Sequence, residues 1–377
     1  MQLLPSLSAK AGVPVFRDVD VQRESFCDMG LQGQRAAMRA CCAMMADTVD
    51  RSLRNGSTED SLIARFFKPL AIHPGALGLV DDAAVLATDG SDLVITTDAI
   101  VEGVHFLPDD PPDTIARKAL RVNLSDLAAK GATPAGFVLT LALRSFDEVF
   151  LASFAKAIGE DAVSYKFPLL GGDTVSTPGP LMISVTAFGH VPSGKMVRRD
   201  KAQVGDAVVV TGTIGDAALG LAILQSRATA PDDESHDTLV ARYRVPQPRN
   251  ALAAVVRAYA NAAMDVSDGL AGDLAKLCAA SGVSATVDVA KVPLSESAAK
   301  MLRHKSAVME SVLAGGDDYE VLCTVPQNQV AAFLDACHVA GTPATVIGSI
   351  RSGHAAPAFI AGDGQPMILK RLSYSHF

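Results

Sequence analysis

Short β-branched and apolar runs recur along the chain of 377 residues, and longer segments with apolar residues every three or four positions lie between them. The runs predict strands over 92–98, 137–143, 181–191, 207–211, 283–289, 319–325 and 344–350, and one more strand that ends at Asp265. The longer segments predict helices over 113–130, 147–164, 216–225, 250–260, 268–280 and 327–340, with a polar loop over 229–237. Because strands and helices alternate, the pattern predicts a mixed α/β fold.

Two changes in this pattern divide the chain. Residues 1–57 carry scattered charges of both signs, and a short helix over 34–53 is the element predicted there. Three interpretations of this extension stay open: a disordered tail, a family-specific segment, or an early start codon with Met44 or Met45 as the true start. Further along, Pro192-Ser-Gly-Lys is a typical turn before a basic stretch, and it predicts a domain boundary. The predicted segments are 1–57, 58–192 and 193–377.

Composition and charge narrow the function classes. Hydrophobic residues make up 49% of the chain and charged residues 20%, which excludes a chain that is disordered as a whole. The net charge of −8 argues against gripping nucleic acid with the protein's own cations. No apolar run reaches the ~18 residues that span a bilayer, and a basic segment followed by an apolar signal core is missing. The six cysteines fit no zinc spacing, which favours idle thiols in a reducing compartment. We therefore expect a cytoplasmic protein without membrane or nucleic-acid partners. If it handles phosphorylated molecules, a divalent metal is the obvious source of positive charge.

Aspartates gather in turns next to apolar runs, and several of these turns contain glycine. These turns contain Asp81, Asp82, Asp98, Asp173, Asp265, Asp268, Asp317 and Asp318. Ligands of α/β proteins bind at strand ends, and hard carboxylate oxygens suit Mg²⁺. Taken singly, each aspartate is more simply a turn residue, and Asp268 is a candidate helix cap. Four or five such turns together favour a metal site. Asp126 lies within a predicted helix, where a pair with Lys130 four residues on is the simpler explanation.

One near-match to a phosphate-binding P-loop is rejected. The segment Gly189-His-Val-Pro-Ser-Gly-Lys-Met has the spacing, but Met196 offers no hydroxyl for Mg²⁺ and Pro192 removes a backbone donor. A Gly-rich loop of the protein-kinase type and a Gly-x-Ser-x-Gly elbow are missing as well. We therefore interpret the near-match as a chance match in the linker.

Eight sequence blocks, in this order and at these spacings, resemble thiamine-monophosphate kinases, whose superfamily also includes aminoimidazole ribonucleotide synthetases. The blocks are Asp81-Asp-Ala-Ala-Val-Leu, 96–106, Lys118-Ala-Leu-Arg-Val-Asn-Leu-Ser-Asp-Leu-Ala-Ala-Lys-Gly-Ala, Leu170-Gly-Gly-Asp-Thr, Val210-Thr-Gly-Thr-Ile-Gly-Asp, Asp265-Val-Ser-Asp-Gly-Leu, Gly315-Gly-Asp-Asp-Tyr-Glu and Tyr374-Ser-His-Phe. The resemblance covers about 61–377. It implies a mixed α/β (α+β), two-domain PurM-like fold, with N-terminal domains that pair into a β-barrel across a homodimer and a C-terminal α/β domain.

The resemblance also implies a reaction and a site. The reaction is transfer of the ATP γ-phosphoryl group to thiamine monophosphate, giving thiamine diphosphate, with several Mg²⁺ ions. The implied metal ligands are Asp82, Thr96, Thr97, Asp98, Asp126, Asp173, Asp265 and Asp268, of which Asp98, Asp126, Asp265 and Asp268 are the implied catalytic set. The implied ATP contacts are Gly172, Asp173, Arg199 and Ser267. The implied substrate contacts are His105, Asp317 and Tyr374.

Two positions depart from the family pattern, and two other functions stay open. Val80 replaces a usual Gly, and Asp317 replaces a usual Glu. These departures suggest a non-catalytic regulator that binds nucleotide and Mg²⁺. The other alternative is a different ATP-dependent synthetase or maturation enzyme of the same superfamily. Against it, Cys27 lacks the context of the reactive cysteine in selenophosphate synthetases, and the chain ends at Phe377 rather than at the cysteine of the hydrogenase-maturation relative.

Overall fold

The computed structural model describes residues 77–373, except 79, 82, 83, 89, 146 and 305–307. The segment 1–57 with its predicted helix over 34–53 lies outside the described residues, and so do Asp82 and Tyr374. All described residues belong to one compact unit of the chain.

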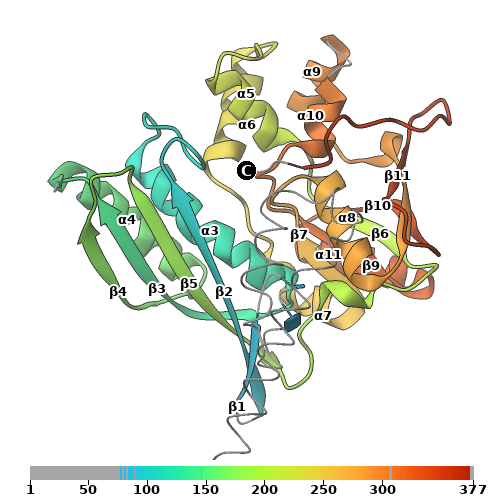
Figure 1. The fold of residues 1–377 in the computed structure, drawn as a ribbon, viewed down its shortest axis with the longest axis horizontal. Helices are drawn as coiled ribbons and strands as arrows, with labels where there is room; N and C mark the ends of the chain where they lie inside the picture. Colours follow the sequence, from blue (N-terminus) through green and yellow to red (C-terminus); the bar gives the residue numbers. More distant parts are fainter. Residues whose placement is uncertain are drawn as a thin grey trace, which may run out of the picture. The chain divides into compact units, whose positions relative to one another are not determined.

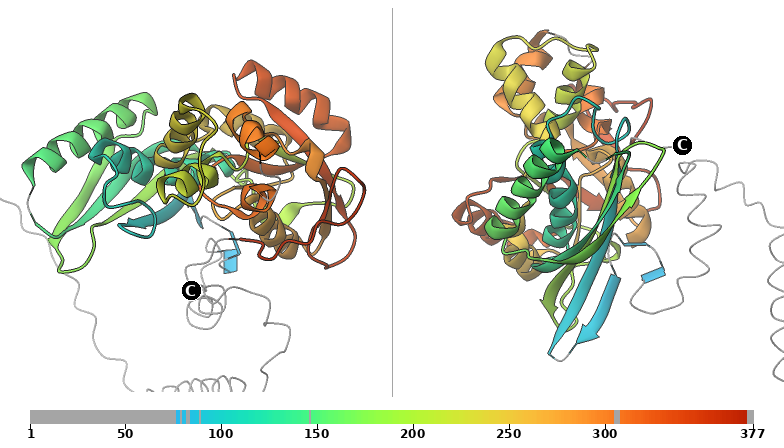
Figure 2. Two further views of the ribbon diagram at one scale, coloured as in Figure 1. Left: turned by 90° about the horizontal axis from the view of Figure 1, so that it is seen from above. Right: turned by 90° about the vertical axis from the view of Figure 1, so that its left-hand side faces the viewer.

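The first part of the described chain builds a five-stranded sheet, here called the first sheet, with the order β1-β2-β5-β3-β4 (Figure 1). Its strands are β1 (Ala84–Thr88), β2 (Ser91–Val101), β3 (Thr133–Leu143), β4 (Leu169–Ser176) and β5 (Met182–Pro192). Neighbouring strands are antiparallel except for β3 and β4, which are parallel. Two helices, α3 (Pro112–Ala129) and α4 (Glu148–Ser164), cover the same face of this sheet, as Figure 2 shows.

Local sequence explains these elements. In β2 the side chains of Asp92, Val94 and Thr96 are buried and alternate with more exposed neighbours, as expected for a sheet with one covered face. Proline in the first turn suits the start of α3, and the chain leaves that helix through Gly131, whose φ of +68° favours glycine. The carboxylate of Asp147 caps α4 by accepting the backbone N–H of Phe150 at 3.0 Å.

The rest of the chain builds a six-stranded sheet, here called the second sheet, with the order β11-β8-β10-β6-β9-β7. Its strands are β6 (Ala207–Thr211), β7 (Ala262–Asp265), β8 (Ser284–Asp288), β9 (Val321–Val325), β10 (Ala344–Arg351) and β11 (Ala358–Ile360). Its helices are α5 (Asp216–Leu224), α6 (Asp233–Arg244), α7 (Ala253–Tyr259), α8 (Leu270–Ser281), α9 (Glu296–His304), α10 (Met309–Ala314) and α11 (Val330–Val339). Single-turn 3-10 helices are η5 (Arg199–Lys201), η6 (Asn250–Leu252), η7 (Val289–Lys291) and η9 (Gln327–Gln329).

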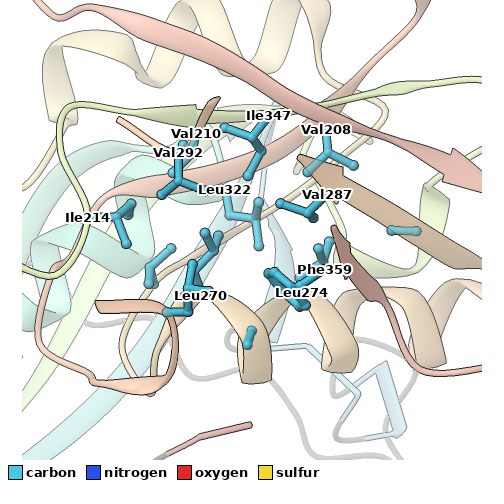
Figure 3. Packing of buried hydrophobic residues seen from close by; sticks show 14 of the residues in the cluster. Val208, Val210, Ile214, Leu270, Leu274, Val287, Val292, Leu322, Ile347 and Phe359 are labelled. Carbon is cyan, nitrogen blue, oxygen red and sulfur yellow. The ribbon is translucent and has the colours of Figure 1, made fainter. Parts of the chain in front are cut away.

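Apolar side chains fill both faces of the second sheet. Figure 3 shows Leu270 and Leu274 of α8 against Val208, Leu322 and other side chains of one face. The opposite face packs against helices α7 and α11, through buried residues that include Val256, Phe333 and Cys337. Because these strands are covered on both sides, they read as continuous apolar runs, and the predicted strand over 207–211 is confirmed residue for residue.

Several predicted boundaries are wrong for identifiable reasons. Asp98 and Asp173 do not end strands. Strand β2 pairs with β5 as far as Val101, and β4 pairs with β3 beyond Asp173 as far as Ser176. The predicted loop over 229–237 is wrong from Asp233 onward, where α6 begins. Its cap is the carboxylate of Asp232, which accepts the backbone N–H of Ser235 at 2.7 Å. Asp268 is not a helix cap either, because α8 begins at Leu270 after Gly269.

The described residues also bear on the membrane and cysteine expectations. None of the helices in the described part of the chain is both long and apolar enough to cross a membrane. Cys278, Cys323 and Cys337 are free, buried thiols. Burial raises the pKa of the Cys278 thiol to about 12, which agrees with the interpretation of these cysteines as unreactive.

Candidate active site

A cavity of about 650 Å³ lies between the two sheets and their helices. One wall comes from β2, the following loop and α3, and the facing wall comes from α5, α8, α10 and the loop 315–319. The predicted site residues that line it are Asp98, His105, Asp126, Asp265, Ser267, Asp268 and Asp317. The structure therefore brings together side chains that lie up to 219 positions apart in the sequence, from Asp98 to Asp317.

Hydroxyl groups hold two of the cavity carboxylates, and one side-chain amide holds the backbone at Asp98. Thr96 Oγ1 donates to Asp126 Oδ2 at 2.5 Å, which links β2 to α3. The backbone N–H of Asp98 donates to Asn123 Oδ1 at 3.0 Å. Ser125 Oγ donates to Asp265 Oδ2 at 2.6 Å, which joins α3 to the end of β7. Helix α3 thus orients acidic groups from both sides of the cavity.

The aspartates of the cavity raise one another's pKa. Asp98 is open to the water in the cavity, yet the surrounding protein raises its pKa to about 6, first by desolvation and then through the charge of Asp268. Burial and the charges of Asp265 and Asp98 raise the pKa of Asp126 well above its usual range. Burial also raises the pKa of Asp265, although the Ser125 hydrogen bond opposes this. Crowded carboxylates of this kind fit a site that takes a cation.

The donor set suits Mg²⁺ rather than a softer metal. The groups are carboxylate and hydroxyl oxygens, the ligands that Mg²⁺ prefers. Among the described residues, no three His, Cys, Asp or Glu side chains form a group that could hold a metal ion by themselves.

Helix α8 adds two residues that the sequence did not single out. Lys276 forms an ion pair with Asp268, and both line the cavity. Asp273 is fully buried, accepts the backbone N–H of Asp268 at 2.9 Å, and has its pKa raised to about 7, chiefly by burial. Spacing alone gave a weak signal: residues 273 and 276 lie one turn apart on a helix that follows the Asp265-Val-Ser-Asp turn.

Two of the three predicted substrate residues, His105 and Asp317, have defined contacts in the structure. The ring of His105 accepts the backbone N–H of Val101 at its Nδ1, at 3.0 Å. The carboxylate of Asp317 accepts from Lys118 Nζ at 2.9 Å and from the Tyr319 hydroxyl at 3.2 Å. Asp317 and Tyr319 both have positive φ, +72° and +52°, so the predicted strand over 319–325 begins only at Val321.

Other acidic turn residues serve the framework. Asp318 is buried and accepts the backbone N–H of Gly215 at 2.8 Å. Glu320 is buried and pairs with Arg242 at 2.9 Å and with Arg249. Asp81 pairs with Lys130 at 2.6 Å, and the positive charge of Lys130 also lowers the pKa of Asp126.

Five predicted site residues do not line this cavity. Thr96 contacts the cavity residue Asp126 through its hydroxyl group. Thr97 Oγ1 donates to the carbonyl oxygen of Val185 at 3.1 Å. Gly172 and Asp173 lie in the exposed strand β4, and Arg199 lies in η5. At Gly172 a Cβ atom would come within 1.9 Å of the Leu139 carbonyl oxygen, so the close pairing of β3 and β4 requires glycine there. Asp82 and Tyr374 lie outside the described residues.

The two sheets correspond to two known domains. Residues 80–191 match the family model for the N-terminal domain of AIR synthase related proteins, and residues 203–357 match the model for the C-terminal domain. The chain therefore has the mixed α/β, two-domain PurM-like fold of that class.

Individual relatives narrow the class. The thiamine-monophosphate kinase of Caulobacter vibrioides is 42% identical over 325 residues, which cover 85% of this chain and 91% of the relative. The crystal structure of the thiamine-monophosphate kinase from Stenotrophomonas maltophilia K279a is 38% identical with a TM-score of 0.69, covering 82% of this chain and 96% of the other. A structure of AaThiL complexed with AMPPCP and TMP is 30% identical with a TM-score of 0.70, covering 80% and 97%. The chain belongs to the thiamine-monophosphate kinase family.

Proposed function

We propose that this protein transfers the γ-phosphoryl group of ATP to thiamine monophosphate and forms thiamine diphosphate. The observation that carries the proposal is the convergence of Asp98, Asp126, Asp265 and Asp268 on one cavity between the two sheets. The family supports it, because a relative has been seen with both an ATP analogue and TMP. A cavity of about 650 Å³ is of a size that accommodates small-molecule substrates.

The reaction requires neutralisation of the negative charge on the two substrates more than it requires a strong general base. The accepting phosphate oxygen is already largely anionic at pH 7, because the second pKa of a phosphate monoester is about 6. The difficulty is to bring two polyanions together beside several carboxylates. Bound Mg²⁺ would neutralise that charge and stabilise the transferring phosphoryl group.

The chain's own residues would prepare this arrangement. Asp98, Asp126, Asp265 and Asp268 would hold Mg²⁺, with Thr96 and Ser125 keeping two of the carboxylates in fixed orientations through their hydrogen bonds. We also propose Asp82, Thr97 and Asp173 as metal ligands. Ser267 would contact ATP, together with Gly172, Asp173 and Arg199. His105 and Asp317 would bind the thiamine phosphate from opposite sides of the cavity, with Tyr374 as the third contact.

We further propose that the protein is a homodimer that pairs through the first sheet. Every residue of β4 is exposed, including the side chains of Leu169, Leu170 and Val175. Exposed apolar side chains on a sheet favour an interface. A barrel formed with a second copy would cover this strand. Gly172 and Asp173 would then lie next to the second subunit. We place this reaction in the cytoplasm, where ATP and reduced thiols coexist.

Product analysis tests the proposed function. Purified protein is incubated with ATP, MgCl₂ and thiamine monophosphate, and thiamine diphosphate is measured by chromatography. We expect product only when all three are present. Binding of ATP by calorimetry without any turnover would instead support a non-catalytic regulator, and ATP consumption without thiamine diphosphate would point to a synthetase.

A further inference from the structure

A buried lysine next to the cavity contacts residues from both halves of the described chain. Lys118 of α3 is 1% exposed, and its Nζ lies 2.9 Å from Asp317 Oδ2. The same Nζ lies 3.8 Å from the centroid of the Tyr243 ring in α6, a cation–π contact. Lys118 comes from the elements of the first sheet, whereas Asp317 and Tyr243 come from those of the second. One ammonium group therefore joins both halves of the described chain.

The contacts continue to the residues that face the cavity. The Tyr243 hydroxyl donates to the carbonyl oxygen of His105 at 3.3 Å, and the Tyr319 hydroxyl donates to Asp317 Oδ1 at 3.2 Å. The resulting series runs His105, Tyr243, Lys118, Asp317, Tyr319, and we call it the lysine bridge. His105, Asp317 and Tyr319 line the cavity, while Lys118 and Tyr243 are not among its described lining residues. Lys118 of α3 and Tyr243 of α6 thus affect the cavity through their contacts with Asp317 and His105.

The bridge has a specific task at Asp317. A non-glycine residue rarely adopts positive φ, so the backbone at 317 and 319 keeps this conformation only where its surroundings hold it. The backbone N–H of Asp317 donates to the Ser267 carbonyl oxygen at 2.8 Å, which fixes the main chain. Lys118 fixes the side chain, because a buried ammonium group needs its carboxylate partner. The direction of the Asp317 carboxylate is therefore set from the first sheet.

We propose that Lys118 and Tyr243 are positioning residues for the substrate side of the cavity. They set the separation between His105 and Asp317, and thereby the affinity for a phosphorylated heteroaromatic cation such as thiamine monophosphate. This inference rests on the proposed function, because it assigns His105 and Asp317 to that substrate. It assigns Lys118 and Tyr243 no role in ATP binding, because their side chains contact Asp317 and His105, and Ser267, which is assigned to ATP, is reached only by the backbone N–H of Asp317.

Two variants and one matched control test the bridge. Lys118→Met keeps most of the side-chain length but removes the charge, and Tyr243→Phe keeps the ring but removes the hydroxyl. Lys291→Met is the control, because Lys291 is exposed and pairs only locally with Asp288. For each purified full-length protein, KM and kcat are measured for both substrates. Binding of thiamine monophosphate is measured by calorimetry without ATP, and folding is checked by the thermal midpoint.

The expected pattern is selective for one substrate. Loss of the charged contact in Lys118→Met should raise KM and Kd for thiamine monophosphate by about 10-fold or more, with KM for ATP nearly unchanged. Tyr243→Phe should raise them by roughly 2- to 10-fold, the range for one neutral hydrogen bond. Lys118→Arg should recover part of the loss, because it restores the charge in a different shape. The control should match the wild type.

A double variant and the thermal midpoint separate positioning from stabilisation. If Lys118 acts through Asp317, Lys118→Met combined with Asp317→Asn should bind thiamine monophosphate no worse than the weaker single variant. Effects that multiply would overturn the proposal. So would a lower thermal midpoint with unchanged KM for thiamine monophosphate, or an equal rise of both KM values. If Lys118→Met does not fold, Tyr243→Phe decides by the same criteria. Turnover by the wild type reports on the proposed function separately.

Discussion

Replacement of Asp273 by asparagine should flatten the dependence of stability on pH. Asp273 is fully buried in α8, where its carboxylate accepts the backbone N–H of Asp268 at 2.9 Å. Burial raises its pKa from 3.8 to about 7, opposed by the charge of Lys276 and assisted by those of Asp268 and Asp265. An asparagine at this position keeps an oxygen that accepts the same N–H, but it cannot ionise.

The sign and the size follow from the raised pKa. Because the folded-state pKa lies above the unfolded value, ionisation is less favourable in the folded protein. The associated stability is fully present below about pH 4 and is lost as the pH rises through about 7. A shift of about three units corresponds to up to roughly 4 kcal/mol of unfolding free energy. The Asp273→Asn variant should keep much of this stability at pH 8, less a small loss from the 3.4 Å contact with Lys276.

Urea unfolding followed by circular dichroism, at intervals from pH 4 to pH 8, measures this effect. The difference between Asp273→Asn and the wild type should move in favour of the variant as the pH rises. Asp335→Asn, an exposed change on α11, serves as the control and should follow the wild type throughout. If the curves for Asp273→Asn and the wild type run parallel over the whole range, the reasoning about burial is refuted.

Three further predictions concern the cavity and its framework. Asp98→Ala and Asp265→Ala should each abolish thiamine diphosphate formation with an unchanged circular dichroism spectrum, and full activity in both would contradict the metal assignment. Ser125→Ala removes the 2.6 Å bond to Asp265 and should lower kcat by about 10-fold, as measured by steady-state kinetics. Glu320→Gln removes the buried carboxylate that pairs with Arg249 and that, together with Asp216, pairs with Arg242, and it should lower the unfolding free energy by about 3–5 kcal/mol; an unchanged urea midpoint would refute this.

Sequence patterns predicted the fold best where one period was maintained. The strand over 207–211 is buried and apolar up to Thr211, and the helix over 113–130 keeps its period up to Gly131; both are confirmed, the helix to within a residue at each end. Elements whose ends depend on a single cap or on pairing with a distant strand were harder. Helix α6 begins at a side-chain cap inside a polar stretch, and β2 extends past Asp98 because β5 pairs with it.

The sequence also predicted some residues of the site and missed others. Predicted strand ends pointed to Asp98 and Asp265, and a glycine pair pointed to Asp317; the structure places all three at one cavity. Lys118 was not recognised, because a lysine on a helix is usually a solvated surface residue and its partner lies 199 positions away. Tyr319 was missed for a similar reason: its hydroxyl becomes informative only once the positive φ of the loop brings it to Asp317.

The most direct test of the account follows the phosphorus atom. Full-length protein is incubated with γ-³²P-labelled ATP, MgCl₂ and thiamine monophosphate, and the label and ADP are quantified over time. The account predicts one labelled thiamine diphosphate for each ADP formed, and none with Asp98→Ala. Release of the label as inorganic phosphate, or thiamine diphosphate without the label, would contradict direct transfer between the two substrates in this cavity.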